Sequence, residues 1–185
     1  GFDAWLAGRG LDVVALQELR CPPDEVGAFD GYRAAIDCGS IPGRNGVTTA
    51  IRVSGLGSTW FEASSDMPVG LFFPGFAQGD ANADLGDSAI CETAGFGGFS
   101  LAASPALVQL VGGTVTEAIA YSREMYDVTV ARNPGMSLPA LDFAGTPCGI
   151  DVRKVVDNGI RPVITTGIAH REAGVGQIGA GIVRA

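Results

Sequence analysis

The sequence has few of the residues that build metal centres or nucleic-acid surfaces. It contains one histidine, and its four cysteines are spaced too far apart for a zinc knuckle or a redox Cys-x-x-Cys pair. Acidic residues outnumber basic residues by 20 to 12, which gives a net charge of −8. A nucleic-acid-binding domain carries the opposite charge balance. We therefore expect no cofactor and no nucleic-acid partner.

Long hydrophobic runs are also missing. The longest apolar runs are interrupted well short of the ~20 residues that cross a membrane. Residues 1–5, GFDAW, lack the basic segment that precedes the apolar part of a signal peptide. The sequence thus predicts a cytoplasmic protein that contacts no membrane and whose cysteines stay reduced.

What the sequence does contain is typical of a globular protein. Apolar residues make up 46% and charged residues 17% of the 185 positions, a length that suits one domain or a domain with a short passenger segment. Apolar runs between turn residues predict strands, and helical periodicity predicts helices among them. We therefore predict a mixed α/β (α+β) fold, a layered sheet with helices. The predicted strands are 12–16, 31–36, 48–54, 59–62, 70–73, 138–143, 162–170 and 182–184.

The most strongly marked helix begins at Thr114. Thr114 and Glu117 form the Thr-x-x-Glu pattern of a capping box, and we predict that the helix extends to about residue 131. Residues 133–135, Asn-Pro-Gly, should form a turn. A shorter helix over residues 150–158 should end at Gly159, because glycine favours the position just past a helix end.

Residues 75–99 combine an acidic stretch with a glycine-rich apolar one. Asp80, Asp84, Asp87 and Glu92 lie close together at its centre. One interpretation is structural, with Asp84 or Asp87 capping a helix that runs through Glu92, because a short acceptor satisfies free N–H groups and an acid complements the helix dipole. The other interpretation is a functional site, and the sequence favours neither.

A second candidate site surrounds the single histidine. His170 follows a predicted strand, is flanked by Arg171 and Glu172, and precedes a glycine-rich stretch, a setting that suits proton transfer or oxyanion binding. A purely structural histidine is the alternative. Residues 174–179, GVGQIG, match the dinucleotide pattern Gly-x-Gly-x-x-Gly, but no helix follows them. We expect a turn that is either structural or exposes backbone N–H groups to an anion.

The beginning of the chain carries a first resemblance. Residues 5–18, WLAGRGLDVVALQE, and residues 43–47, GRNGV, are similar to the start of the exonuclease III and apurinic endonuclease family. The resemblance implies that Glu18 ligates a divalent metal, although the other residues that the family uses have no counterpart further along. An exposed carboxylate at the end of a strand is the alternative for Glu18.

The remainder of the chain carries a second resemblance. Its main stretches are 51–57 (IRVSGLG), 70–75 (GLFFPG), 80–90 (DANADLGDSAI), 139–143 (PALDF), 149–156 (GIDVRKVV) and 166–183 (TGIAHREAGVGQIGAGIV). These stretches are similar to the C-terminal part of the YlbE-like family, which includes a subunit of oxamate carbamoyltransferase. Because members of that family are considerably longer, the resemblance implies a truncated chain.

The second resemblance implies carbamoyl transfer. The reaction would be the phosphorolysis of oxalurate, a small molecule, to oxamate and carbamoyl phosphate, carried out with partner subunits. Such a transfer needs donors for phosphate and for charge on the carbamoyl oxygen. We expect His170 and Arg171 to act at the reacting group, and Asp87 and Glu92 to orient an amide or a donor. The expected anion-binding residues are Gly174, Gly176, Gly179 and Thr146.

Residues 45–47, Asn-Gly-Val, belong to both resemblances, which suggests a fusion. In this hypothesis residues 1–44 are an exonuclease III-like passenger, and residues 45–185 are a YlbE-like region that is inactive alone and forms homo-oligomers. Two other hypotheses stay open: a metal-dependent DNA nuclease fragment centred on Glu18, and a non-catalytic folded or assembly module. A single family that resembles both by chance is the alternative to the fusion itself.

Overall fold

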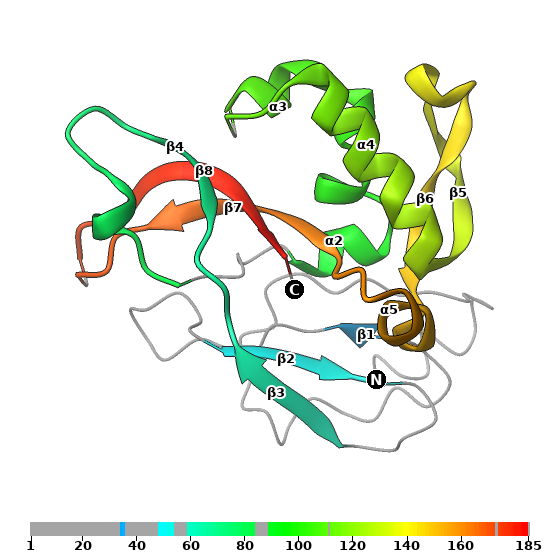
Figure 1. Ribbon diagram of the computed structural model, residues 1–185, viewed down its shortest axis with the longest axis horizontal. Coiled ribbons are helices and arrows are strands. Elements are labelled where there is room, and N and C mark those ends of the chain that lie inside the picture. Colours follow the sequence, from blue (N-terminus) through cyan, green and yellow to red (C-terminus); the bar gives the residue numbers. More distant parts are fainter. Residues whose placement is uncertain are drawn as a thin grey trace, which may run out of the picture.

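A three-stranded antiparallel sheet positions most of the residues discussed below (Figure 1). Its strands lie in the order β4 (Val69–Phe72), β8 (Gln177–Arg184), β7 (Val163–Ala169). The computed structural model describes residues 34–35, 48–53, 59–83, 89–110, 112–172 and 174–184, and the structural statements below concern these residues.

Two smaller groups of strands accompany this sheet. β1 (Ala34–Ala35), β2 (Thr48–Arg52) and β3 (Trp60–Ser64) form a second antiparallel sheet. β5 (Thr129–Leu138) pairs with β6 (Ala144–Ile150) as a long hairpin. The pairing of β2 with β3 confirms the hairpin predicted there. Antiparallel strands mixed with helices confirm the predicted α/β class.

Short helices and 3-10 turns connect and cover the strands. The α-helices are α2 (Ala89–Thr93), α3 (Pro105–Leu110), α4 (Val115–Met125) and α5 (Val152–Asn158). The 3-10 segments are η2 (Gln78–Asp80), η3 (Gly97–Ala103), η4 (Tyr126–Val128) and η5 (Pro139–Leu141). Figure 1 shows α4 between the three-stranded sheet and the β5–β6 hairpin.

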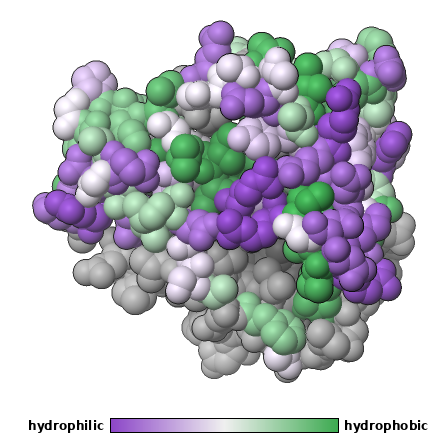
Figure 2. Space-filling model, viewed as in Figure 1, coloured by the Kyte–Doolittle hydropathy of each residue, from purple (hydrophilic) through white to green (hydrophobic). Residues whose placement is uncertain are grey.

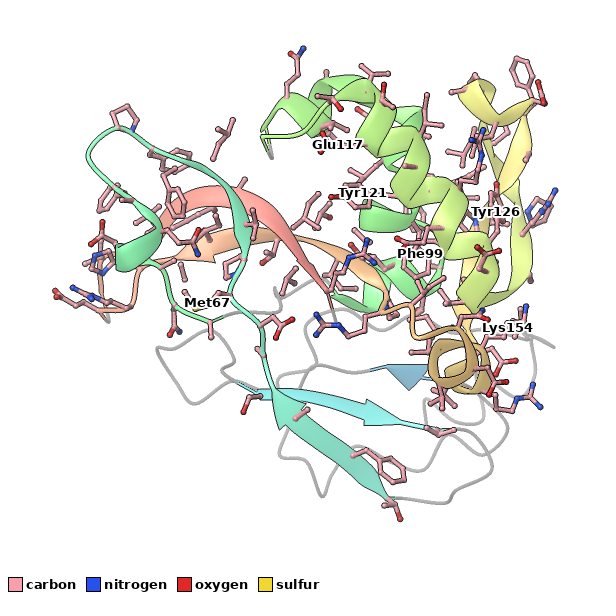
Figure 3. The ribbon with its side chains drawn as sticks, in the orientation of Figure 1. Met67, Phe99, Glu117, Tyr121, Tyr126 and Lys154 are labelled. Carbon is pink, nitrogen blue, oxygen red and sulfur yellow. The ribbon has the colours of Figure 1, made fainter. Side chains whose placement is uncertain are left out.

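The main core lies where η3 and α4 meet the sheet. Phe99 of η3 is fully buried, and Figure 3 shows it beside α4 on the side that faces the sheet. Burying a phenylalanine side chain contributes about 1.5–3 kcal/mol, so this contact helps to hold the irregular η3 segment in place. The buried members of the cluster are Phe99, Leu101, Val108, Ala118, Met125, Val128 and Val163.

Helix α4 begins as predicted and ends earlier. Thr114 Oγ1 accepts a hydrogen bond from Glu117 N at 3.2 Å, and Glu117 Oε2 accepts one from Thr114 N at 2.7 Å, which confirms the capping box. The predicted extension to about residue 131 is wrong, because β5 starts at Thr129. Thr129 Oγ1 donates to Met125 O at 2.8 Å at the point where the helix ends.

The β5–β6 hairpin replaces two predicted features. The turn predicted at residues 133–135 lies within β5, where the register shifts and Asn133 Nδ2 donates to Ala94 O at 2.9 Å. The strand predicted at residues 138–143 is wrong, because η5 turns the chain there. Phe143 has a φ of 58°, a left-handed conformation that no regular strand contains.

Local sequence signals placed two helices correctly. The side chain of Asp151 accepts a backbone hydrogen bond at the start of α5, and Gly159 follows its end with a φ of 66°. Helix α2 runs through Glu92 as predicted, whereas its predicted caps, Asp84 and Asp87, lie outside the described residues.

Strand β8 is longer than predicted. It begins at Gln177 rather than at residue 182, because its glycines allow β4 to come close. A Cβ on Gly179 would overlap the carbonyl oxygen of Leu71 on β4, so only glycine fits at this position. The turn between β7 and β8 is therefore confined to residues 170–176.

Candidate functional site

Glu92 is a carboxylate with 0% exposure on α2. Its Oε1 accepts hydrogen bonds from Gly98 N at 3.0 Å, from Thr165 N at 3.0 Å and from Thr165 Oγ1 at 3.1 Å. Gly98 belongs to η3 and Thr165 to β7, so one carboxylate links three elements. Glutamate is almost never fully buried without such partners.

The surroundings of Glu92 favour its protonated form. Its Oε2 is buried and has no hydrogen-bond partner among the described residues. Burial raises the pKa of Glu92 from 4.5 to about 7, and the hydrogen bonds from Gly98 and Thr165 oppose this shift only in part. A carboxyl group with such a pKa can gain or lose a proton near neutral pH, as general acid–base chemistry requires.

A glycine makes room for this carboxylate. Gly97 has a φ of 56°, and a Cβ at this position would overlap Glu92 Oε1. Both constraints exclude other residues at position 97. Part of the glycine-rich run that follows the acidic segment thus serves to bring η3 against Glu92 and β7.

Thr146 on β6 borders the same backbone turn. Its Oγ1 is buried without a hydrogen-bond partner among the described residues, and a Cβ on Gly95 would overlap it. Glu92 and Thr146 are therefore two buried polar groups around one glycine turn, residues 95–97, and each keeps one oxygen that is not hydrogen-bonded.

His170 lies just past the end of β7, half-buried beside η2. Its backbone pairs with Ala81, and its N–H donates to Gly176 O at 3.0 Å. Nδ1 accepts a hydrogen bond from Glu172 N at 2.9 Å, which assigns the proton of the neutral ring to Nε2. The ring of Phe76 meets the imidazole edge to face, with centroids 5.8 Å apart. The imidazole is thus held in one orientation.

Three other predicted residues lie beside His170. The side chain of Arg171 is exposed, while its backbone N–H donates to Asp80 O at 2.8 Å. Gly174 and Gly176 are exposed in the turn between β7 and β8. An imidazole, a guanidinium and a glycine turn therefore share one part of the surface, an arrangement that suits an anion. We call His170, Arg171, Gly174 and Gly176 the histidine cluster.

The predicted site residues do not form a single site among the described residues. Thr165, which holds Glu92, precedes His170 by five positions along β7, a separation of roughly 16 Å at the rise of a strand. Glu92 and Thr146 therefore lie apart from the histidine cluster. Asp87 and Glu18 lie outside the described residues.

Sequence reasoning missed Thr165. Its amide and hydroxyl both bond to Glu92, yet it stands beside Thr166 in an ordinary β-branched strand pattern that marks neither residue as special. Gly179, expected to bind an anion, lies buried within β8, where it packs against β4.

Two kinds of feature are absent from the described ranges. Within these ranges, no group of three or more His, Cys, Asp or Glu side chains is arranged to hold a metal ion. In the same part of the chain, no helix is both long enough and apolar enough to cross a bilayer.

The chain has clear relatives among known proteins. Residues 40–88 match the family model of the oxamate carbamoyltransferase subunit AllG. Over 143 residues the chain is 53% identical to the oxamate carbamoyltransferase subunit AllG of Escherichia coli K12. This match covers 77% of this chain and 34% of AllG. It is 52% identical over 140 residues to the uncharacterised protein YahG of the same strain, covering 76% of this chain and 30% of YahG.

A solved structure supports the fold. The crystal structure of a conserved protein of unknown function from Enterococcus faecalis V583 matches with a TM-score of 0.74 and 49% identity, over 84% of this chain and 36% of that chain. The chain thus spans about a third of the length of these relatives. The similarity to AllG confirms the expected relation to an oxamate carbamoyltransferase subunit, and the resemblance of residues 1–47 to exonuclease III stays a prediction.

Proposed function

We propose that this chain is part of a carbamoyltransferase subunit related to AllG, and that it works with partner subunits on a small carbamoyl substrate. The long, high-identity match to AllG carries the proposal. Since the chain spans only about a third of AllG, we expect it to be inactive alone. A shared fold does not by itself give a shared activity, so the chemistry of the residues has to be argued separately.

The proposed reaction is the phosphorolysis of oxalurate. A phosphate oxygen attacks the carbamoyl carbon, the bond from this carbon to the oxamate nitrogen breaks, and that nitrogen takes up the proton that phosphate releases. The products are oxamate and carbamoyl phosphate. Negative charge develops on the carbamoyl oxygen in the transition state, so fixed N–H donors close to it lower the barrier.

The histidine cluster is the proposed binding site for phosphate. Arg171 offers a guanidinium fork that matches phosphate geometry, and the Nε2–H of His170 offers a second donor with a fixed orientation. The backbone near Gly174 and Gly176 can add N–H donors. His170 is also the proposed group that moves the proton to the leaving nitrogen, because an imidazole ring can both accept and donate a proton.

Glu92 and Thr146 enter the proposal as a second polar group. Glu92 bonds to Thr165, roughly 16 Å along β7 from the imidazole, so the two side chains act on different atoms. We propose that Glu92 positions β7 for the reaction and that Asp87, five residues before it in the acidic segment, orients the substrate amide.

A hybrid subunit tests the proposal. The matched segment of Escherichia coli AllG is replaced by the corresponding segment of this chain, the hybrid is purified with its partner subunits, and carbamoyl phosphate formation from oxalurate and phosphate is measured. We expect activity within about tenfold of the native complex, and His170→Ala in the hybrid should lower kcat by about 10²-fold or more.

An arginine pair provides the control. Arg171→Ala should raise the KM for phosphate, whereas Arg123→Ala, which removes an exposed arginine on α4, should leave KM and kcat unchanged. A hybrid that assembles with its partners but forms no carbamoyl phosphate would contradict the proposed chemistry.

A non-catalytic assembly module is the second candidate function. The separation of Glu92 from the histidine cluster favours it, because no complete site forms within the described residues. In that case the hybrid would assemble and both His170→Ala and Arg171→Ala would leave the activity of the complex unchanged.

The hypothesis of a nuclease-like passenger concerns residues 1–44 and has its own test. Magnesium-dependent cleavage of abasic DNA by the purified chain, lost in Glu18→Gln, would support it. Limited proteolysis that leaves a stable core beginning near residue 45 would support the proposed boundary.

A further inference from the structure

The β4–β8–β7 sheet has two edges with different surroundings. At the β7 edge, three of the outward backbone groups have partners from other elements. Val163 N donates to Met125 Sδ at 3.4 Å, Thr165 N donates to Glu92 Oε1 at 3.0 Å, and Ala169 O accepts from Asn82 N at 2.9 Å. Side chains and backbone of other elements thus occupy this edge, and they hinder the pairing of a further strand.

The β4 edge is different. Phe73 N donates to Ile178 O of β8 at 2.8 Å, and amides alternate in direction along an antiparallel strand. The N–H and C=O groups of Gly70 and Phe72 therefore point away from β8. Within the ranges that the structure describes, no hydrogen bond to these outward groups is found. β4 thus presents a short open edge.

One face of β4, continued by Phe73 just after the strand, carries exposed apolar side chains, whereas Phe72 packs against the core. Val69 is 71% exposed, Leu71 50% and Phe73 49%. Figure 2 shows hydrophobic side chains gathered on the side of the molecule where Figure 1 places β4, and toward the centre. Residues 67–79 contain no charged residue. Natural edge strands are usually protected by charges, bulges or a covering element, and an apolar open edge is a template for pairing.

We propose that β4 is the surface through which two copies of this chain associate, by antiparallel pairing of β4 with β4 of the second copy. An antiparallel pair of identical strands is related by a two-fold axis, so the same four residues serve both partners. The pairing would join the two sheets into one of six strands.

Charge supports a second copy as the occupant. The chain carries a net charge of −8, so most pairs of surfaces on two copies repel each other. The uncharged stretch 67–79 avoids this repulsion. The acids that flank it are already engaged: Asp66 pairs with Arg161 at 2.6 Å, and Asp80 Oδ2 accepts from Ala77 N at 2.9 Å. Raising the salt concentration should therefore strengthen association, because it screens the remaining repulsion.

A pair of matched valine substitutions tests the proposal. Val69→Lys places a charge on β4, whereas Val156→Lys places one on α5, where valine is 79% exposed. Figure 3 shows Met67, next to β4, and Lys154, on α5, on opposite sides of the molecule. Sedimentation velocity of the full 185-residue chain should find a dimer for the native protein and for Val156→Lys. Val69→Lys should weaken dimerisation at least tenfold.

Hydrogen exchange gives a second, independent readout. The outward amides of Gly70 and Phe72 should gain protection as the protein concentration rises, while the inward amide of Leu71 should stay protected throughout. A native chain that remains a monomer up to about 100 µM overturns the proposal and leaves the edge to a strand of a different chain. Equal dimerisation of Val69→Lys and Val156→Lys also overturns it.

Discussion

At the β7 edge of the main sheet, a thioether, a buried carboxylate and a backbone N–H from three different segments meet the outward backbone groups. At the β4 edge, about 10 Å away across two strand spacings, no hydrogen bond from a described residue reaches the outward groups. The first edge uses long-range packing for its closure, since Met125, Glu92 and Asn82 lie far from β7 in sequence. The second edge has outward backbone groups without described hydrogen-bond partners and exposed apolar side chains, which are the features of a surface that can bind another strand.

Covering a sheet edge with a carboxylate has an energetic cost. A carboxylate that closes the β7 edge must be desolvated, and the raised pKa of Glu92 reports the cost. The three hydrogen bonds to its Oε1 offset part of that cost. Substitutions or pH changes at the β7 edge should therefore alter the free energy of unfolding strongly. Substitutions at the β4 edge should alter it little.

The largest effect should come from Gly97→Ala. The new Cβ would overlap Glu92 Oε1 and would also need a left-handed backbone, so we expect a loss of about 3 kcal/mol in the free energy of unfolding. Urea denaturation measures it. Gly79→Ala is the control, because a Cβ at Gly79 meets no atom within 4 Å. Its loss in the free energy of unfolding should be well under half of the loss for Gly97→Ala. Equal losses for both variants would contradict the tight fit around Glu92.

The pH dependence of stability should come next. Because the pKa of Glu92 rises from 4.5 to about 7 on folding, its contribution is fully present below pH 4.5 and is lost as the pH rises through 7. The shift corresponds to about 3 kcal/mol over this window. Glu92→Gln cannot ionise, so its unfolding free energy should lack this decline between pH 4.5 and 8. A decline of the same size in the variant would show that another group causes it.

Thr165→Val should have a moderate effect. The substitution removes the hydrogen bond of 3.1 Å from Thr165 Oγ1 to Glu92 Oε1 and keeps the shape of the side chain. We expect a loss of about 1–2 kcal/mol, larger at pH 8, where Glu92 is ionised, than at pH 5. Thr165→Ser keeps the hydroxyl and should retain most of the stability. Thermal unfolding at the two pH values separates these outcomes.

The smallest effect should come from the open edge. Val69→Thr keeps a β-branched side chain at a position that is 71% exposed, so the unfolding free energy of the monomer should change by less than about 0.5 kcal/mol. Dilute protein should be used so that association does not contribute. A loss above about 1 kcal/mol would mean that Val69 is buried and that β4, like β7, is covered by another part of the protein.

Features set by local chemistry could be predicted from the sequence. The capping box of Thr114 and Glu117 needs residues only three positions apart, and Gly159 ends α5 by its own backbone freedom. Strand β7 followed from an apolar run between turn residues, and the mixed fold class followed from such runs together with helical periodicity. The place of His170 at the end of this strand could also be anticipated, together with the turn that follows it.

Features set by distant contacts could not be predicted in this way. The strand expected at residues 138–143 is a 3-10 turn because β5 and β6 pair around it, and Gly179 lies within β8 because β4 needs its space. The acidic segment offered two interpretations of Glu92, and neither included a bond to Thr165, 73 positions away. Such contacts leave no periodic signal at either residue.

The order of strands in the main sheet has a consequence for how the chain folds. β7 and β8 are joined by a short turn and can pair within microseconds, as hairpins do. β4 must find β8 across about a hundred intervening residues, and closing so long a loop carries an entropic cost before any pairing is gained. Until that closure, β8 is itself an exposed edge. We therefore expect the docking of β4 to limit the folding rate, and the time that β8 spends uncovered to set how readily the protein aggregates during refolding.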